Sequence, residues 1–324
     1  MKAALLRAGK VVVDEVPDPS PTMGQVLVSV KACGICGSDL HFVKHGREML
    51  ELAGRMGGMP DFGEMLTSLD KDVYMGHEFA GEVLDIGPDT AGPTKGSIVT
   101  SIPVMVELTG VEPLVYSNRL PCGYSEMMLL SAPLLQTVPN GLDARHAALT
   151  EPMAVGLHAV NKSGISPGEG ALVLGCGPIG IAVIAALKLR GVEPIVAADF
   201  SPKRRSLATV MGAHEAVDPA REPSFDAWNR VGRGRSLVVF EAVGVPGMIN
   251  EVLQWAPSHS RVVVVGVCMG ADTITPFWAI TKELSVQFAL AYDPLEFNDS
   301  LKSIAEGDID VGPLITGEVG VEGV

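Results

Sequence analysis

The sequence has few positive charges and few aromatic side chains. Its 24 Lys and Arg residues stand against 38 Asp and Glu residues, which gives a formal net charge of -14. A protein that binds nucleic acid needs a basic surface to displace counterions from phosphates, so we expect no nucleic-acid partner. Aromatic residues make up only 5% of the chain, whereas 47% of it is hydrophobic and 37 residues are glycine. That balance is typical of a close-packed α/β protein.

Long hydrophobic runs and a framework of paired cysteines are also missing. No apolar run reaches the roughly 18 residues of a membrane span, and residues 1–10 contain no basic segment leading into an apolar run and a cleavage site. We therefore expect neither a membrane span nor secretion. The five cysteines are an odd number dispersed over 324 residues, which favours reduced thiols and a cytoplasmic location over disulfides.

The length of the chain and a change of pattern along it predict two domains. Up to about Ala132, short extended runs alternate with Pro and Gly clusters, which is typical of a mostly β domain. These runs are Val11–Val13, Gln25–Val30, Glu82–Ile86 and Ser97–Ser101. We place this first domain at residues 1–154.

The second domain, residues 155–292, contains apolar runs without alternation, separated by segments of helical periodicity. The runs are Ala171–Leu174, Pro194–Ala198, Leu237–Phe240 and Arg261–Val265, with weaker candidates at Glu215–Asp218 and Ser285–Leu290. Strands that alternate with helices form βαβ units and a parallel sheet. Six strands complete a doubly wound sheet that binds a nucleotide.

A glycine-rich turn follows the first of these strands. Ala171–Leu174 leads directly into Gly175-Cys176-Gly177-Pro178-Ile179-Gly180, and apolar residues at helical spacing continue to Leu189. In such a turn Gly175 permits the tight bend, Gly177 lets the backbone approach a pyrophosphate, and Gly180 lets helix and strand pack closely. The phosphates then meet the N-terminus of the helix. The pattern predicts a dinucleotide site that includes Pro178 and Ile179.

Asp199 ends the next strand, 19 positions after Gly180. An acidic side chain at this place accepts hydrogen bonds from the ribose hydroxyls and repels a 2′-phosphate, which favours NAD. Two alternatives stay open. The basic residues at 203–205, among them Arg204, could receive a 2′-phosphate, and Asp199 could simply cap the helix expected near Pro202.

Three separated fragments contain residue types that bind metals. They are Cys33-Gly34-Ile35-Cys36-Gly37-Ser38-Asp39-Leu40-His41, Gly76-His77-Glu78 and Thr150-Glu151-Pro152. Together with the nucleotide domain they resemble the zinc-containing medium-chain dehydrogenase/reductase family, in particular its polyol, butanediol and threonine dehydrogenase branch. The resemblance covers nearly the whole chain. It implies a GroES-like, mostly β catalytic domain, then a Rossmann domain, with residues 293–324 returning to the catalytic domain.

By this resemblance, Cys36 and His77 are zinc ligands, and Cys33 is a packing residue. In the branch named, a glutamate in a Glu-Pro-x-x-x-x-x-His context supplies the third ligand, which corresponds to Glu151, and Glu78 is expected nearby or exchanging with a ligand. A thiolate, a carboxylate and a neutral imidazole neutralise Zn²⁺ and leave a fourth position open, as in catalytic sites. Without the resemblance, Cys36 reads as a small buried hydrophobe, His77 as a core residue and Glu151 as a helix N-terminal charge.

The resemblance implies a zinc-dependent oxidoreductase that transfers a hydride between a secondary alcohol, diol, polyol or amino alcohol and NAD. Zinc lowers the pKa of a bound alcohol as it does that of water. The family passes the alcohol's proton through a hydroxyl at the position of Ser38, and in some members to a histidine at the position of His41. His41 is equally compatible with a surface role.

The segment after Gly96-Ser97-Ile98-Val99 departs from the family. Many relatives hold a structural zinc there with four cysteines, whereas this stretch contains only Cys122, and one cysteine cannot close a tetrahedral site. We therefore expect a single zinc ion per chain. The lobe is expected to be shortened or packed by apolar residues, namely Val104, Val106, Leu108 and Val111.

Two further departures concern an insertion and the C-terminus. Cys36 and His77 are 41 positions apart, and the extra stretch Glu48–Tyr74 either lines a substrate cleft or is a surface addition. Its methionines, Met49, Met56, Met59 and Met65, suit an adaptable binding surface. The family normally continues with a strand and a helix after a motif like 314–317, so the last domain is expected to be truncated or to continue past Val324.

Two other functions remain open. A zinc-free quinone or enoyl reductase on the same fold would need no metal ligands, and a non-catalytic nucleotide-binding protein would place no chemical demand on Ser38. For assembly, relatives usually pair through the last strand of the nucleotide domain, here Ser285–Leu290. We therefore expect a homodimer or homotetramer.

Overall fold

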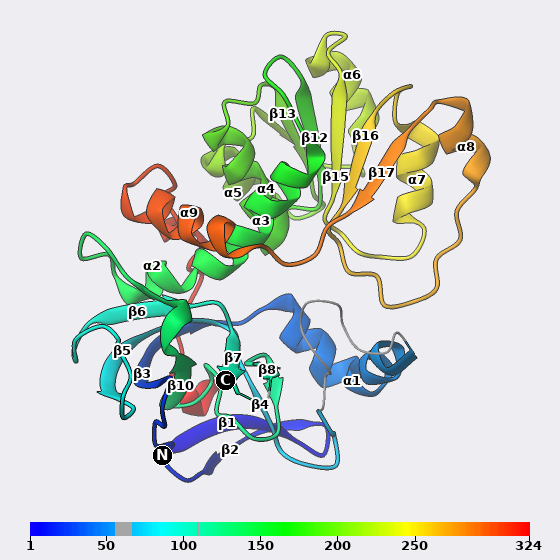
Figure 1. Cartoon of the computed structure of the whole chain (residues 1–324). Helices are drawn as coiled ribbons and strands as arrows, with labels where there is room; N and C mark the ends of the chain where they lie inside the picture. Colours follow the sequence, from blue (N-terminus) through cyan, green and yellow to red (C-terminus); the bar gives the residue numbers. More distant parts are fainter. Residues whose placement is uncertain (56–66, 109) are drawn as a thin grey trace. The chain divides into compact units, whose positions relative to one another are not determined.

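The computed structural model describes residues 1–55, 67–108 and 110–324, which form two compact units (Figure 1). The first unit comprises Met1–Glu151, Ile304–Glu306 and Ile315–Val324, and the second comprises Pro152–Ser303 and Gly307–Leu314. The segment 293–324, expected to rejoin the first domain, is thus divided between the two units. None of the described helices combines the length and the apolar character that crossing a bilayer requires.

The first unit is built from antiparallel strands. One sheet has the order β2-β1-β4-β9, a second has the order β10-β3-β5-β6-β11, and β7 and β8 form a hairpin. The strands are β1 Lys2–Arg7, β2 Lys10–Glu15, β3 Gln25–Gly34, β4 Val73–Met75, β5 Glu78–Ile86, β6 Ile98–Ser101, β7 Val104–Glu107, β8 Gly110–Pro113, β9 Tyr116–Ser117, β10 Met127–Ser131 and β11 Leu135–Thr137. The helices are α1 Gly37–Arg55 and α2 Ala144–Ala148, with short 3-10 turns at Ala132–Leu134 and Val321–Gly323.

Alternation along the strands creates the core of the first unit. Val26 and Val28 of β3 lie on one face because side chains two positions apart point the same way, and both are fully buried. They pack with Phe79 and Val83 of β5 and with Val99 of β6. This core fixes the end of β3 and the start of β5, beside which Cys36, His77 and Glu78 lie.

The second unit is a six-stranded, wholly parallel sheet with the order β14-β13-β12-β15-β16-β17. Its strands are β12 Gly170–Leu174, β13 Ile195–Ala198, β14 Glu215–Val217, β15 Leu237–Glu241, β16 Arg261–Val264 and β17 Ser285–Phe288. Its helices are α3 Thr150–Ser163, which starts at the boundary, α4 Pro178–Leu189, α5 Pro202–Met211, α6 Ser224–Gly232, α7 Met248–Trp255, α8 Pro276–Thr281 and α9 Pro294–Ala305, with a 3-10 turn at Gly312–Leu314. β14, the third strand of this sheet in chain order, lies at one edge, and β17, the sixth, lies at the other. The direction of winding therefore reverses between β12 and β15. All six predicted strands and the predicted fold class are confirmed.

Burial on both faces explains why these strands are continuous apolar runs in the sequence. Every residue of β12, β13 and β15 is buried, as expected where helices cover both faces of a parallel sheet. The edge strand β17 differs, because all four of its residues are exposed.

The packing predicted for the shortened lobe is wrong in its details. Val106 and Val111 are 43% and 46% exposed, and Leu108 is 97% exposed, so these side chains do not form a core. Met105, the inward neighbour of Val106 on β7, is fully buried instead and packs with Leu114. The error is one of register, since a shift by one residue moves a strand's side chains to the opposite face.

Only part of the predicted insertion is described. Met49 belongs to α1 and packs, partly buried, on a cluster of the first unit that includes Phe42 and Tyr116. Met56, Met59 and Met65 lie outside the described residues. The part that is described therefore adds to the first unit's own core.

Candidate metal and nucleotide sites

Cys36, His77 and Glu78 come together at the ends of paired strands. Cys36 lies between the end of β3 and the start of α1, and His77 lies between β4 and β5. The pairing of Gly34 with Glu78 holds the two segments side by side. One ligand atom from each of the three residues lies within 4.8 Å of the other two.

Glycine at position 34 makes room for the third member of this cluster. A Cβ atom on Gly34 would lie 1.9 Å from Glu78 Oε2, so any side chain there would displace the carboxylate. Glu78 is 6% exposed. Burial raises the pKa of Glu78 and His77 opposes this shift, because a carboxylate taken out of water resists ionisation unless a cation is near. The surroundings of Glu78 therefore favour a cation beside its carboxylate.

Asp39 faces the ring of His77 and was not predicted from the sequence as a residue of the site. Its Oδ1 is 3.5 Å from His77 Nδ1, and its Oδ2 accepts hydrogen bonds from the Cys36 backbone N–H at 3.1 Å and from the Tyr124 hydroxyl at 2.6 Å. A carboxylate that faces one ring nitrogen typically orients a metal-binding histidine and leaves the other nitrogen, here Nε2, for the ion. The available signal was the position of Asp39, three residues after Cys36 in the same motif.

Glu151 is not a member of the three-residue cluster. It is half-buried in the first turn of α3, and its negative charge still acts on His77. Burial disfavours the charged imidazole, but Asp39, Cys36 and Glu151 outweigh burial and raise the pKa of His77 well above its usual value. The residues around His77 thus create a strongly negative local field, which a metal cation would neutralise.

The donor set fits a zinc ion. A thiol, an imidazole and a carboxylate are the groups that zinc prefers. Burial raises the pKa of Cys36, whereas the interaction with His77 lowers it. Asp39 Oδ1 and His77 Nδ1 face each other at 3.5 Å and have no closer hydrogen-bond partner among the described residues. A cation on His77 Nε2 would strengthen this contact, because it makes the Nδ1–H a better donor to the carboxylate.

The remaining residues of the cysteine motif have different surroundings. Ser38 is half-buried near the start of α1, and its hydroxyl interacts with the Cys36 thiol and the Tyr116 phenol. His41 is exposed, and its ring lies 6.4 Å from that of His45. Cys33 lies against Gly123 and its Sγ donates to the Gly34 carbonyl at 3.5 Å, in keeping with a packing role.

The glycine turn of the second unit has the geometry that a dinucleotide requires. Gly175 has a φ of 86°, which a residue with a side chain rarely adopts. A Cβ on Gly180 would lie 1.9 Å from the Gly175 carbonyl oxygen, whereas a Cβ on Gly177 would meet no atom within 4 Å. Gly180 is thus required by packing, while Gly177 borders open space. Pro178 begins α4, with Gly177 as its N-cap and Ile179 half-buried in the first turn.

Asp199 supports this turn from the neighbouring strand. Its Oδ2 accepts from the Cys176 N–H at 2.9 Å, and its Oδ1 accepts from the Ser201 N–H at 2.7 Å. The N-cap of α5 is Ser201 and not Asp199, so the capping alternative for Asp199 is wrong. Arg204 is exposed and lies 3.7 Å from Asp199 Oδ2, whereas Arg205 is tied to the carbonyl oxygens of Asp199 and Phe200.

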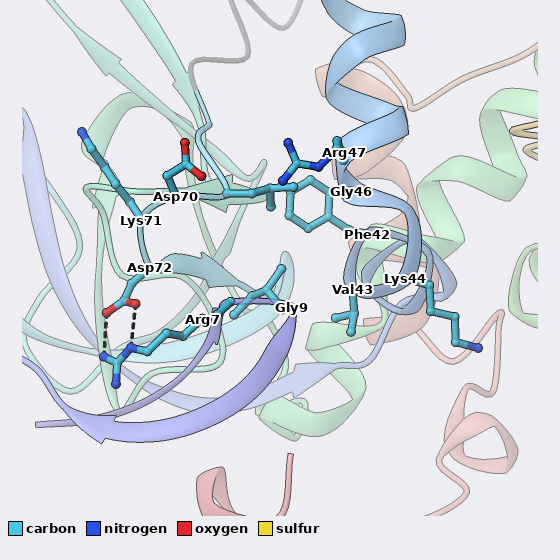
Figure 2. Close-up of a pocket in the computed structure, with 13 residues that line it drawn as sticks. Arg7, Gly9, Phe42, Val43, Lys44, Gly46, Arg47, Asp70, Lys71 and Asp72 are labelled. Carbon is cyan, nitrogen blue, oxygen red and sulfur yellow. Dashed lines mark hydrogen bonds and ion pairs between the residues drawn. The ribbon is translucent and has the colours of Figure 1, made fainter.

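A cavity of about 600 Å³ lies elsewhere in the first unit (Figure 2). It is lined by residues of β1, α1 and the segment before β4, including Phe42 and Arg47. Arg7 is held there by two hydrogen bonds to Asp72, at 2.8 and 2.7 Å. No member of the metal cluster lines this cavity, so its volume is separate from the candidate chemistry.

Comparisons with known proteins agree with this geometry. Residues 22–139 match the alcohol dehydrogenase GroES-like domain, and residues 178–306 match the zinc-binding dehydrogenase model. The chain is 32% identical over 333 residues to (R,R)-butanediol dehydrogenase of Bacillus subtilis, covering 98% of this chain and 92% of the relative. The chain belongs to the zinc-binding medium-chain dehydrogenase family. It is therefore an oxidoreductase with a GroES-like domain and a Rossmann domain.

Solved structures of this family superpose on nearly the whole chain. The crystal structure of 2R,3R-butanediol dehydrogenase from Bacillus subtilis matches with a TM-score of 0.80 and 30% identity, covering 97% of this chain and 90% of that one. A zinc-binding dehydrogenase from Sinorhizobium meliloti 1021, solved with NADP, matches with a TM-score of 0.79 and 26% identity over 98% and 96% of the chains. The predicted family and fold are confirmed.

Proposed function

We propose that the protein is a zinc-dependent dehydrogenase that transfers a hydride between NAD and a secondary alcohol, diol, polyol or amino alcohol. The observation that carries this proposal is the convergence of Cys36, His77 and Glu78 within 4.8 Å, with Asp39 behind the histidine. The similarity to butanediol dehydrogenase supports an alcohol with a neighbouring oxygen as substrate.

In this proposal, Cys36 and His77 hold one zinc ion together with a carboxylate. Glu78 is already in the cluster, and Glu151 acts on it through its charge. We assign the third position to these two glutamates, either of which would supply the carboxylate ligand. Bound zinc supplies Lewis acidity to the substrate hydroxyl, and the nicotinamide supplies a hydride acceptor.

The protein's own groups then position the ligands and move the proton. Asp39 holds the Cys36 backbone and faces His77, so it fixes the orientation of two ligands at once. Ser38 is two residues past Cys36 and accepts the substrate's proton as it gives up its own. His41 is exposed, so it is placed where it could release that proton to solvent.

We assign the dinucleotide to the turn at 175–180, with Asp199 facing the ribose. Asp199 already accepts one backbone hydrogen bond on each oxygen, and each oxygen keeps a lone pair for a ribose hydroxyl. Its negative charge favours NAD over NADP, whereas the exposed Arg204 would favour NADP. Replacing Asp199 with Ser is therefore expected to shift the preference toward NADP.

For assembly, we propose a homodimer or homotetramer that pairs through β17. This edge strand exposes Phe288 by 64%, and Leu290 just beyond it is 60% exposed, which is an apolar edge suited to a symmetric partner. Light scattering of the wild type and of Phe288→Glu tests this assignment. A wild type that is monomeric at micromolar concentration would contradict it.

The decisive test of the function is a panel of short diols, polyols and threonine assayed with NAD and with NADP, with zinc quantified in the same sample. We expect turnover of at least one diol or polyol with NAD and loss of turnover after chelation. A zinc-free quinone or enoyl reductase would instead reduce activated double bonds in chelated samples. A non-catalytic nucleotide-binding protein would bind NAD and turn over none of these compounds.

A further inference from the structure

Tyr116 is a buried tyrosine whose hydroxyl has no hydrogen-bond partner among the described residues. The residue is 6% exposed. Another buried tyrosine, Tyr124, shows the usual situation, because its hydroxyl donates to Asp39 at 2.6 Å. A buried hydroxyl left unpaired costs about 1–3 kcal/mol, so such a group in a folded protein calls for an explanation.

The backbone places Tyr116 beside the metal cluster. It lies on β9, where it pairs with Met75 of β4, and His77 follows Met75 by two residues. Its ring stacks on Phe42, with centroids 3.8 Å apart and planes inclined by 6°. Phe42 lies four residues after Ser38 on α1, and residues four apart share one face of a helix. Tyr116 therefore approaches the cluster from the side of Ser38.

The surroundings of the phenol include Asp39, Ser38 and Cys36. Burial and the charge of Asp39 raise the pKa of Tyr116, while the Ser38 hydroxyl acts in the opposite direction. A phenol is protonated at neutral pH even at its ordinary pKa of about 10, so Tyr116 has a hydrogen to donate. Asp39 Oδ2 already accepts from Tyr124 and from the Cys36 N–H, and Asp39 Oδ1 faces His77 Nδ1. Asp39 acts on the phenol through its charge, so the Ser38 hydroxyl is the uncharged group left to receive this hydrogen.

We propose that Tyr116 donates a hydrogen bond to Ser38 and so positions the hydroxyl through which the substrate's proton leaves. A serine hydroxyl has one hydrogen and two acceptor lone pairs. When Tyr116 occupies one lone pair, the other is left for the substrate hydroxyl, and the serine hydrogen points away along the exit path. Tyr116 is thus a positioning residue that acts through Ser38, and the proposal rests on the proposed function.

Tyr116 belongs to the segment in which the resemblance would place the cysteines of a structural zinc. Tyr116 follows the β7–β8 hairpin directly, in the stretch where only Cys122 stands among the residues expected for a structural zinc. This segment therefore contributes Tyr116 to the surroundings of the metal cluster.

The test compares Tyr116→Phe, Ser38→Ala and the double variant, with Tyr74→Phe as a matched control on the neighbouring strand β4. Phenylalanine keeps the ring stacked on Phe42 and removes only the hydroxyl. Proton relays contribute about 10²–10⁴-fold to rate, so losing the positioning group is expected to lower kcat about tenfold. KM and zinc content should stay unchanged. Ser38→Ala should lower kcat further, and the double variant should be no slower than Ser38→Ala alone.

A second readout does not depend on catalysis. In the metal-free protein, the melting-temperature shifts of Tyr116→Phe and Ser38→Ala should be non-additive, because residues in direct contact share an interaction energy. Additive losses in both kcat and melting temperature would overturn the contact. A wild type inactive on every alcohol would overturn the proposed function instead, and the melting cycle would still decide whether Tyr116 bonds to Ser38.

Discussion

The two candidate sites differ in how their polar groups are paired. At the glycine turn of the second unit, Asp199 accepts backbone hydrogen bonds at 2.9 and 2.7 Å. At the metal cluster of the first unit, Asp39 Oδ1, His77 Nδ1 and the Tyr116 hydroxyl are buried without hydrogen-bond partners among the described residues. Both oxygens of Asp199 at the turn are thus paired within the protein, whereas these three buried atoms at the cluster are not.

This difference assigns different roles to the ligands of the two sites. Each buried polar group without a close hydrogen bond costs about 1–3 kcal/mol, and a cation on His77 Nε2 would reduce this cost by strengthening the contact between His77 Nδ1 and Asp39 Oδ1. The turn carries no such cost, and its dinucleotide would bind to a preformed surface. Both ligands are expected to stabilise the folded state through their binding, and zinc is expected in addition to relieve part of the cost of the poorly paired groups around His77.

The largest expected effect contrasts two glycines of the turn. Gly180→Ala places a Cβ 1.9 Å from the Gly175 carbonyl oxygen, and overpacking against backbone should cost about 3 kcal/mol of unfolding free energy. Gly177→Ala meets no atom within 4 Å, so it should fold normally and lose NAD binding. Urea denaturation and NAD titration measure both. Equal stability of the two variants would contradict the conclusion that packing requires glycine at position 180 but not at position 177.

Asp39→Asn tests whether the cluster of the first unit is arranged to hold a metal ion. The amide keeps the size of the side chain but removes the charge facing His77. Losing such a carboxylate typically weakens metal binding by about 10–100-fold, and competition with a chelator would measure it. Tyr124→Phe is the matched control, because it removes the hydrogen bond from the Tyr124 hydroxyl to Asp39 Oδ2 and leaves the charge of Asp39 in place. Asp39→Asn with unchanged zinc affinity would show that the unpaired atoms are not tuned for metal.

The two glutamates around His77 give a smaller contrast. Glu78→Gln removes a member of the cluster, so we expect zinc affinity to fall by about tenfold. Glu151→Gln acts through longer-range charge and should lower resting zinc affinity less, while reducing kcat if it replaces Glu78 during turnover. Chelator competition and steady-state kinetics on the same preparations separate these effects. The reverse order of zinc affinities would assign the resting ligand to Glu151.

The smallest expected effect concerns an ion pair of the first unit that is already satisfied. Arg145 lowers the pKa of Asp143 from its usual value of 3.8 to about 2. A lowered folded-state pKa contributes stability above the unfolded value, and that stability is lost as pH falls from about 4 toward 2. The side chains are 42% and 51% exposed, so the loss should be slight. Melting temperatures of the wild type and Asp143→Asn across this range should converge as pH falls.

The second unit could be predicted from the sequence because local physics determines it. A strand, a turn that needs Gly175 at φ 86° and a helix packed against Gly180 leave a periodic pattern in the chain. All six strands were predicted for the same reason. The bounds differ by one or two residues, as at β17, where pairing ends at Phe288 and not at Leu290.

The first unit could be predicted only in part, because its site depends on contacts between distant residues. The motifs predict Cys36 and His77, but the choice of Glu78 over Glu151 for the cluster follows from the pairing of Gly34 with Glu78. The exposure of Val106 and Leu108 depends on the register of a hairpin. Asp39 and Tyr116 become recognisable only when their unpaired atoms are seen beside Cys36 and Ser38.

The most direct test of the account is the zinc content of wild type, Cys36→Ser and Cys268→Ser, measured by mass spectrometry after purification without chelator. Cys268 is a half-exposed cysteine of the second unit outside the cluster, so its variant controls for general thiol effects. We expect about one zinc per chain in the wild type and in Cys268→Ser. Cys36→Ser should lose the metal and alcohol oxidation together. Full zinc and full turnover in Cys36→Ser would contradict the assignment of the metal site.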